Sequence, residues 1–170
     1  MSNNWEGGYS IASLGQDHHR FEDADTSKAL LLAGVSIPGA RALAGNSDAD
    51  VVLHAITNAI SGVTGRNILG AVADKLCCEG QKDSRAYLDL ALADLREKDM
   101  RLLHLSLSIE ALKPKLSPWI PQMKEQLSAY LGLPVDAIGL TATTGEGLTG
   151  MGQGEGIACL AILTVWKAFG

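Results

Sequence analysis

The chain has 170 residues, 46% hydrophobic and 19% charged, with a formal net charge of −5. These values indicate a globular protein, so we expect one domain over residues 1–170, with residues 1–8 as a disordered tail. The acidic balance and the absence of Lys/Arg clusters disfavour nucleic acid as a partner, and no apolar run approaches the roughly 20 residues of a membrane span. Three cysteines, two of them adjacent, and a start without an apolar or basic leader favour a cytoplasmic location.

The predicted elements alternate strands with three helices. In the first half of the chain we expect a strand over 9–16, a short strand pair over 30–37, a helix capped by Ser47 or Asp48, and glycine-rich loops and turns over 62–82. A helix over 83–98, a strand over 102–110 and a helix from Pro121 to Gly132 should follow. The chain should then form a strand over 138–144, a glycine-rich loop over 145–156 and a strongly apolar segment over 157–169.

This order predicts an α+β fold, with a mixed β-sheet and helices on one face, or an α/β sandwich. The sequence contains no heptads and no internal repeat. The last segment is apolar nearly all round, so we expect it to be a central strand or part of a subunit interface.

Asp17, His18, His19 and His54 form the first group with possible chemistry. A carboxylate and two imidazoles are a common zinc ligand set, and three protein ligands leave one position for water or substrate. In a strand, Asp17 and His19 share one face and His18 points the other way, so the pair Asp17/His19 is preferred. For an isolated Asp-x-His with one distant histidine, however, a structural or surface role is the commoner one.

The second group is the acidic run from Ser47 to Asp50, just before the helix that carries His54. Asp50 lies four residues before His54 and could orient its ring, while Ser47 and the free amides of the first turn could hold a phosphate. The alternative is simple helix capping by acidic residues, which the residues alone favour.

Two later segments could bind phosphates. Thr141 to Glu146 leads into a glycine-rich stretch, where hydroxyls and backbone amides can hold a diphosphate and Glu146 a magnesium ion. Lys115 lies in a proline-rich loop and could meet a phosphate. A glycine-rich hairpin and a solvated lysine are the plainer interpretations.

Taken together and in this order, these segments resemble the 2-C-methyl-D-erythritol 2,4-cyclodiphosphate synthase family. The resemblance covers about residues 9–168 and rests on the combined order and spacing of the motifs. The matching motifs are Asp17-His18-His19, Ser47-Asp48-Ala49-Asp50-Val51-Val52-Leu53-His54, the stretch from Pro114-Lys115 to Met123, Ala142-Thr143-Thr144-Gly145-Glu146 and Gly152-Gln153-Gly154-Glu155-Gly156-Ile157.

The resemblance implies a cytoplasmic homotrimer whose active sites lie between subunits. It implies a phosphorus-oxygen lyase of non-mevalonate isoprenoid biosynthesis, which cyclises 4-diphosphocytidyl-2-C-methyl-D-erythritol 2-phosphate and releases CMP. Implied cofactors are Zn²⁺, and Mg²⁺ or Mn²⁺. The implied site residues are Asp17, His19 and His54 for zinc, Glu146 for magnesium, Thr144 and Glu146 in catalysis, and Ser47, Ala111, Lys115, Leu116, Ala142, Thr143 and Thr144 for the substrate.

Three departures from the family pattern fall on the substrate side. Asn46 stands where the family usually has histidine, Gln153 where it has arginine, and residues 66–82 lack its acidic loop. One interpretation is an active, divergent cyclase that uses Lys75 or Lys82 to hold the erythritol phosphate. The other is a catalytically impaired or re-purposed paralogue that keeps the trimer, the zinc site and a nucleotide pocket.

Overall fold

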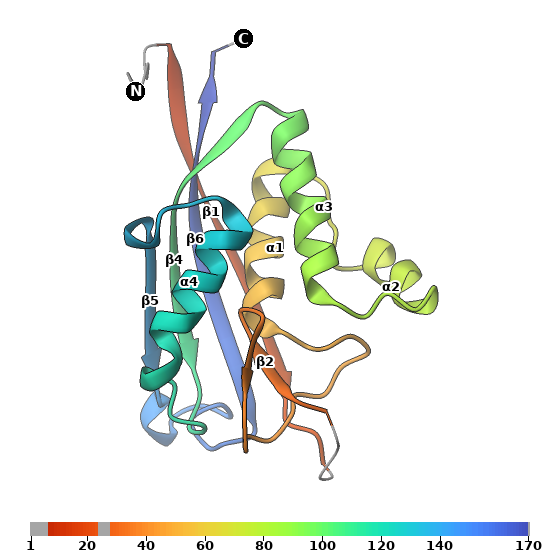
Figure 1. Ribbon diagram of the computed structural model, residues 1–170, viewed down its shortest axis with the longest axis vertical. Coiled ribbons are helices and arrows are strands. Elements are labelled where there is room, and N and C mark those ends of the chain that lie inside the picture. The colour runs from red at the N-terminus through yellow and green to blue at the C-terminus, as the bar shows by residue number, and fades with distance from the viewer. Residues whose placement is uncertain (1–6, 24–27, 170) are drawn as a thin grey trace.

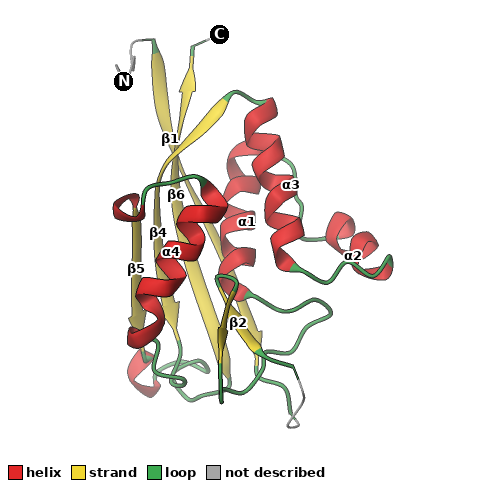
Figure 2. Cartoon of the chain, in the orientation of Figure 1, coloured by secondary structure: helices red, strands yellow, loops and turns green. Residues whose placement is uncertain are grey.

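A computed structural model describes residues 7–23 and 28–169 of the chain. Its main sheet has four strands in the order β1-β6-β4-β5 (Figure 2). The strands are β1 (Gly8–Arg20), β4 (Met100–Glu110), β5 (Ile138–Thr143) and β6 (Gly156–Ala168). β6 is antiparallel to both β1 and β4, whereas β4 and β5 are parallel. The predicted α+β domain with a mixed sheet is therefore confirmed.

Three of the four described α-helices lie over one face of this sheet, and the remaining one, α2, lies to the side of them (Figure 1). The helices are α1 (Val51–Thr64), α2 (Ala71–Cys78), α3 (Ser84–Glu97) and α4 (Ile120–Leu131). A hairpin of β2 (Leu30–Leu32) and β3 (Val35–Ile37) lies below α1 in the view of Figure 1. Within the described ranges, no helix has the length and apolar character that crossing a membrane requires.

The last apolar segment is a central strand, as one of the two expectations had it. β6 lies between β1 and β4, and its residues alternate between buried and more exposed positions. Its residues from Ile157 to Val165 at odd positions are buried under the helices, and Leu163 is 0% exposed. This alternation explains the apolar sequence, because the even positions of β6 carry apolar side chains on the opposite face.

That opposite face has no helix over it in the described structure. Leu14 on β1 is paired in register with Ile162 on β6, and the two side chains are 57% and 42% exposed. Leu160, two residues along β6, is 37% exposed. A contiguous apolar area in the middle of a sheet face is typical of a surface that is covered in an assembly.

Some predicted boundaries were wrong. Residues 62–82 contain the end of α1 and all of α2, where loops and turns were expected. Gly70 precedes α2 without a side-chain cap, and α2 has no fully buried residue, so no capping signal marks its start. Its partly buried residues, Val72, Ala73, Leu76 and Cys77, do recur at helical spacing. Of the predicted tail, residues 1–6 lie outside the described residues, and Gly8 already pairs with Ala168 in the sheet.

Candidate metal centre and substrate site

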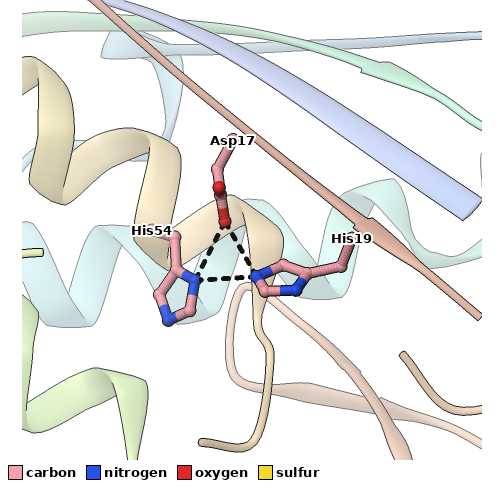
Figure 3. A group of neighbouring side chains, drawn as sticks. All are labelled: Asp17, His19 and His54. Atoms are coloured by element: carbon pink, nitrogen blue, oxygen red, sulfur yellow. Dashed lines mark hydrogen bonds and ion pairs between the residues drawn. The ribbon is translucent and has the colours of Figure 1, made fainter. Parts of the chain in front are cut away.

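Asp17, His19 and His54 converge at one place (Figure 3). Asp17 and His19 project from the same face of β1, as the strand alternation predicts, and His54 comes from α1. Asp17 Oδ2 lies 2.9 Å from His54 Nδ1 and 3.0 Å from His19 Nε2, and the two ring nitrogens are 3.2 Å apart. One carboxylate oxygen and two imidazole nitrogens therefore face a common point.

A glycine brings the helix to the strand at this point. A Cβ atom placed on Gly15 would lie 2.2 Å from the Ala55 carbonyl oxygen and 2.2 Å from the Ala59 amide nitrogen. Any larger residue at position 15 would push α1 away from β1. Because Gly15 is two residues before Asp17 and Ala55 follows His54, this close packing sets the distance between the metal-site residues.

The two rings are oriented by bonds to their outer nitrogens. His19 Nδ1 lies 2.8 Å from the Ala44 carbonyl oxygen, and His54 Nε2 lies 2.8 Å from Ser84 Oγ. A carbonyl accepts, so it holds a proton on the outer nitrogen of His19 and leaves Nε2 as the nitrogen that can bind a metal ion. This donor set fits Zn²⁺, with one coordination position left for water or substrate.

The protonation states of Asp17 and His19 depend on each other. Burial by itself raises the pKa of Asp17, but hydrogen bonds from His19 and His54 outweigh it and hold that pKa well below its usual range. The same bond to Asp17 raises the pKa of His19 above 6.5, against a smaller opposing effect of burial. The metal-free cluster thus favours an ionised carboxylate beside a protonated imidazole.

Asp50 does not orient His54, so that expectation was wrong. Its carboxylate caps α1 by accepting hydrogen bonds from the amides of Val52 and Leu53. It also accepts hydrogen bonds from the amides of Ala33 and Gly34 in the β2–β3 hairpin. The capping interpretation was right, although the predicted caps were Ser47 or Asp48. Asp50 ties the hairpin to the first turn of the helix that presents His54.

Sequence reasoning missed Ser84, which instead makes the contact to His54. The sequence pattern indicates only that a helix begins near this residue, and indeed Asp83 caps α3 there. The Ser84 hydroxyl also donates to the Asp48 carboxylate. A polar residue at the first position of an amphipathic helix was the only signal in the sequence.

A cavity of about 310 Å³ lies beside the cluster. Besides the three metal-site residues it is lined by side chains that include Asn46, Ser47, Asp74, Cys77 and Tyr87. The segment 66–82 therefore forms a helical wall, and the Cys77 thiol bonds to the Asn46 carbonyl at 3.3 Å. Neither Lys75 nor Lys82 lines this cavity, and Lys75 pairs with Glu79.

The segments expected to hold the nucleotide meet at the ends of β4 and β5. The Ala111 amide donates to the Thr143 carbonyl at 3.0 Å, which joins the two segments. Ala111 and Leu116 are buried, whereas the other expected substrate residues of this edge, Lys115, Ala142, Thr143 and Thr144, are exposed, as is Glu146. Glu146 has a φ of 50° in a tight turn between two glycines.

The metal cluster and the β4–β5 edge lie at opposite edges of the sheet, and a shallow cavity of about 300 Å³ between them is lined by both Asp17 and Thr143. β1 and β5 are the two edge strands, with β6 and β4 between them. At about 4.8 Å per strand spacing, roughly 14 Å separates the two edges. The structure thus brings together the three metal-site residues, and separately the residues of the β4–β5 edge.

Comparisons with known proteins agree with this architecture. The family model described as the YgbB family matches residues 11–166. A 2-C-methyl-D-erythritol 2,4-cyclodiphosphate synthase of Chlamydia trachomatis serovar L2b is 44% identical over 155 residues, which cover 91% of this chain and 86% of the relative.

Two solved structures are also similar. The bifunctional IspDF from Campylobacter jejuni has a TM-score of 0.84 and 30% identity over 95% of this chain, which spans 43% of that longer protein. A CDP-bound form of 2C-methyl-D-erythritol-2,4-cyclodiphosphate synthase has a TM-score of 0.78 and 29% identity, over 90% of this chain and 98% of the other. The chain therefore belongs to the YgbB family, the family of the 2-C-methyl-D-erythritol 2,4-cyclodiphosphate synthases.

Proposed function

We propose that this chain is a metal-dependent cyclase of non-mevalonate isoprenoid biosynthesis. Its substrate would be 4-diphosphocytidyl-2-C-methyl-D-erythritol 2-phosphate, and its products 2-C-methyl-D-erythritol 2,4-cyclodiphosphate and CMP. The observation that carries the proposal is the cluster of Asp17, His19 and His54, with ligand atoms 2.9–3.2 Å apart, in a chain 44% identical to a synthase of that name.

In the proposed reaction an oxygen of the 2-phosphate attacks the β-phosphorus and the bond from that phosphorus to the α-phosphate oxygen breaks, so that CMP leaves with that oxygen. When bound, Zn²⁺ and Mg²⁺ (or Mn²⁺) would neutralise phosphate charge and polarise the phosphorus-oxygen bonds. Asp17, His19 and His54 would hold the zinc ion, and Glu146 the magnesium ion. No side chain is needed as a nucleophile, because the protein acts by positioning the two phosphates.

The nucleotide would be held at the β4–β5 edge. Backbone groups of the expected pocket, Ala111, Leu116, Ala142 and Thr143, would contact the cytosine, while Thr144 and Lys115 would steady the phosphates. Ser47 borders the cavity beside the metal cluster, where it would meet the erythritol phosphate. The bond between the Ala111 amide and the Thr143 carbonyl supports one shared pocket for these segments.

The active protein would be a homotrimer with each site between two subunits. Two features support this assembly: the exposed apolar area around Leu14, Leu160 and Ile162, and the position of the metal cluster and the nucleotide residues at opposite edges of one sheet. A substrate that must touch both edges is bound more easily when the second edge comes from a neighbouring chain.

A second candidate is a re-purposed paralogue that keeps the trimer, the metal centre and a nucleotide pocket. It is favoured by the wall of the cavity beside the metal cluster, where Asn46 and the α2 residues that line it, Ala73, Asp74 and Cys77, contribute no positive charge for a phosphate. Loss of charge-assisted hydrogen bonds, at roughly 1.5–3 kcal/mol each, would slow the parent reaction by orders of magnitude unless it were compensated.

Turnover of the authentic substrate separates the two candidates. Phosphorus NMR of purified protein with zinc and magnesium should show CMP and the cyclic diphosphate, and His54→Ala should abolish both signals. The matched control is His18→Ala, because His18 points away from the cluster, and it should keep zinc. Protein that binds zinc and CDP without forming either product would contradict the cyclase proposal and support the paralogue.

A further inference from the structure

The ring of His54 is supported from behind by two polar side chains that neither ligate nor line the proposed nucleotide site. His54 Nε2, the nitrogen that faces away from Asp17, lies 2.8 Å from Ser84 Oγ. The Ser84 hydroxyl and amide both contact Asp48, the amide at 3.0 Å. Ser84 is 0% exposed and His54 is 7% exposed, so this contact lies inside the protein.

The chemistry of the three groups fixes the direction of the bonds. An ionised carboxylate only accepts, so the Ser84 hydroxyl gives its hydrogen to Asp48. The lone pair of Ser84 Oγ then accepts the N–H at His54 Nε2. With a proton held at Nε2, His54 has Nδ1 available to bind a metal ion placed between Asp17 and His19.

We propose that Ser84, backed by Asp48, is a positioning residue that fixes the ring and tautomer of His54 for metal binding. This inference rests on the proposed metal-dependent function. Histidine ligands usually donate their second N–H to a carboxylate, carbonyl or water, and such partners set the affinity of the site. His19 does so directly, through the Ala44 carbonyl. His54 does so through a serine whose own hydroxyl is bonded to a carboxylate.

The test is the zinc affinity of the full chain, measured by competition with a chromogenic chelator. Ser84→Ala removes the acceptor of the His54 N–H. Asp48→Asn keeps the shape of the side chain but places an NH₂ donor where the carboxylate accepted from the Ser84 hydroxyl. The hydroxyl then turns and donates to His54 Nε2, which favours the His54 tautomer with its proton on Nδ1. Each variant should bind zinc about 10- to 100-fold more weakly than the wild type.

Ser128→Ala is the matched control. Ser128 also lies in a helix, α4, and its hydroxyl donates a hydrogen bond to the backbone carbonyl of Leu133 at 2.5 Å. It should leave the zinc affinity within about twofold of the wild type. The visible spectrum of bound Co²⁺ is a second readout, and it should change in Ser84→Ala and Asp48→Asn but not in Ser128→Ala.

The outcomes are distinguishable. Zinc affinity and a cobalt spectrum unchanged in Ser84→Ala and Asp48→Asn would overturn the inference while leaving the proposed function in place. A lower unfolding temperature of the metal-free variants, with wild-type zinc affinity, would assign Ser84 a purely structural role and overturn it too. If Ser84→Ala does not fold, Asp48→Asn decides. Wild-type protein that binds no zinc would refute the proposed metal-dependent function itself.

Discussion

The two edges of the sheet differ in how far one chain completes them. At the β1 edge, Asp17, His19 and His54 are bonded to one another, and both rings are held from behind by Ala44 and Ser84. At the β5 edge, Lys115, Thr144 and Glu146 are exposed at the surface of loops and turns. The first edge is a preorganised site, whereas at the second edge Lys115 lines a cavity of about 730 Å³ and neither Thr144 nor Glu146 lines it.

This difference suggests that one chain completes the metal site alone, whereas the nucleotide site needs a second chain. A metal ion needs three side chains at fixed distances, and a single chain provides them at the contact of α1 with Gly15. A nucleotide diphosphate is much larger and needs walls on several sides. In the proposed trimer, the exposed apolar face of the sheet would bring a second chain close enough to supply those walls.

The largest effect is expected from Asp17→Ala, which breaks the first edge. Asp17 bonds to both histidines, so its loss removes one ligand and leaves two ring nitrogens 3.2 Å apart without the carboxylate that joins them. We expect loss of zinc binding and a fall in turnover of about 10³-fold or more. Zinc content of the purified protein and phosphorus NMR report the two effects. The exposed Asp136, changed to alanine, is the control, and a zinc-containing Asp17→Ala protein would contradict the account.

Ile162→Glu should separate the proposed subunits without damaging either edge of the sheet. A carboxylate in the middle of the exposed apolar face opposes burial in an interface, so the assembly should dissociate. Sedimentation should give a smaller particle, turnover should fall by about 10²-fold or more, and the zinc content should stay at the wild-type level. Val135→Glu changes another exposed apolar residue, 42% exposed and on η2 (Val135–Ala137), as a control. Wild-type assembly in Ile162→Glu would rule out this face as the interface.

Glu146→Gln tests the second edge alone. Removing the proposed magnesium ligand should lower turnover on the order of 10²-fold and raise the magnesium concentration needed for half-maximal rate. Zinc affinity should not change, because Glu146 is not a member of the cluster. Glu125→Gln, an exposed glutamate on α4, serves for comparison. An unchanged magnesium requirement in Glu146→Gln would remove the proposed role.

The smallest effect is a pH dependence confined to the first edge. The pKa of His19 is raised above 6.5 in the metal-free protein, so protons compete with zinc for Nε2 below that raised pKa. Zinc affinity should rise about tenfold per pH unit until the pH passes the raised pKa, and then level off. The protonated His19 also stabilises the metal-free fold, fully below 6.5 and no longer once the pH exceeds the raised value.

A chelator titration at several pH values measures the zinc affinity, and chemical denaturation of metal-free protein measures the stability. His18→Ala should show the same two profiles, because His18 is on the other face of β1. A zinc affinity that does not vary with pH in the acid range would show that no cluster histidine is protonated in competition with the metal.

Much of this architecture was predictable because it depends on periodic signals. The two-residue rhythm of β1 places Asp17 and His19 on one face, and the helical spacing from Val51 onward identifies α1. The convergence of His54 on that pair was not derivable from spacing, since it depends on a tertiary contact through Gly15. Resemblance to a family supplied what periodicity lacked.

The missed features are local exceptions to those signals. α2 has no capping side chain and no fully buried residue, and the helical spacing of Val72, Ala73, Leu76 and Cys77 extends over less than two turns between Gly70 and Gly80. Ser84 looks like any helix beginning, and its contact to His54 joins residues 30 positions apart in the sequence. Such contacts become visible only when the helices are packed.

Complementation between the two edges tests most directly whether each site is shared between two subunits. His54→Ala, which lacks the metal centre, and Glu146→Gln, which lacks the second edge, are co-expressed with different tags, and mixed trimers that carry both tags are isolated and assayed. If each site combines the metal edge of one subunit with the nucleotide edge of its neighbour, every mixed trimer has one intact site and should show roughly a third of the wild-type rate, although each variant alone is severely impaired. Mixed trimers no more active than the average of the separate variants would place both edges of each site in one chain and contradict the account.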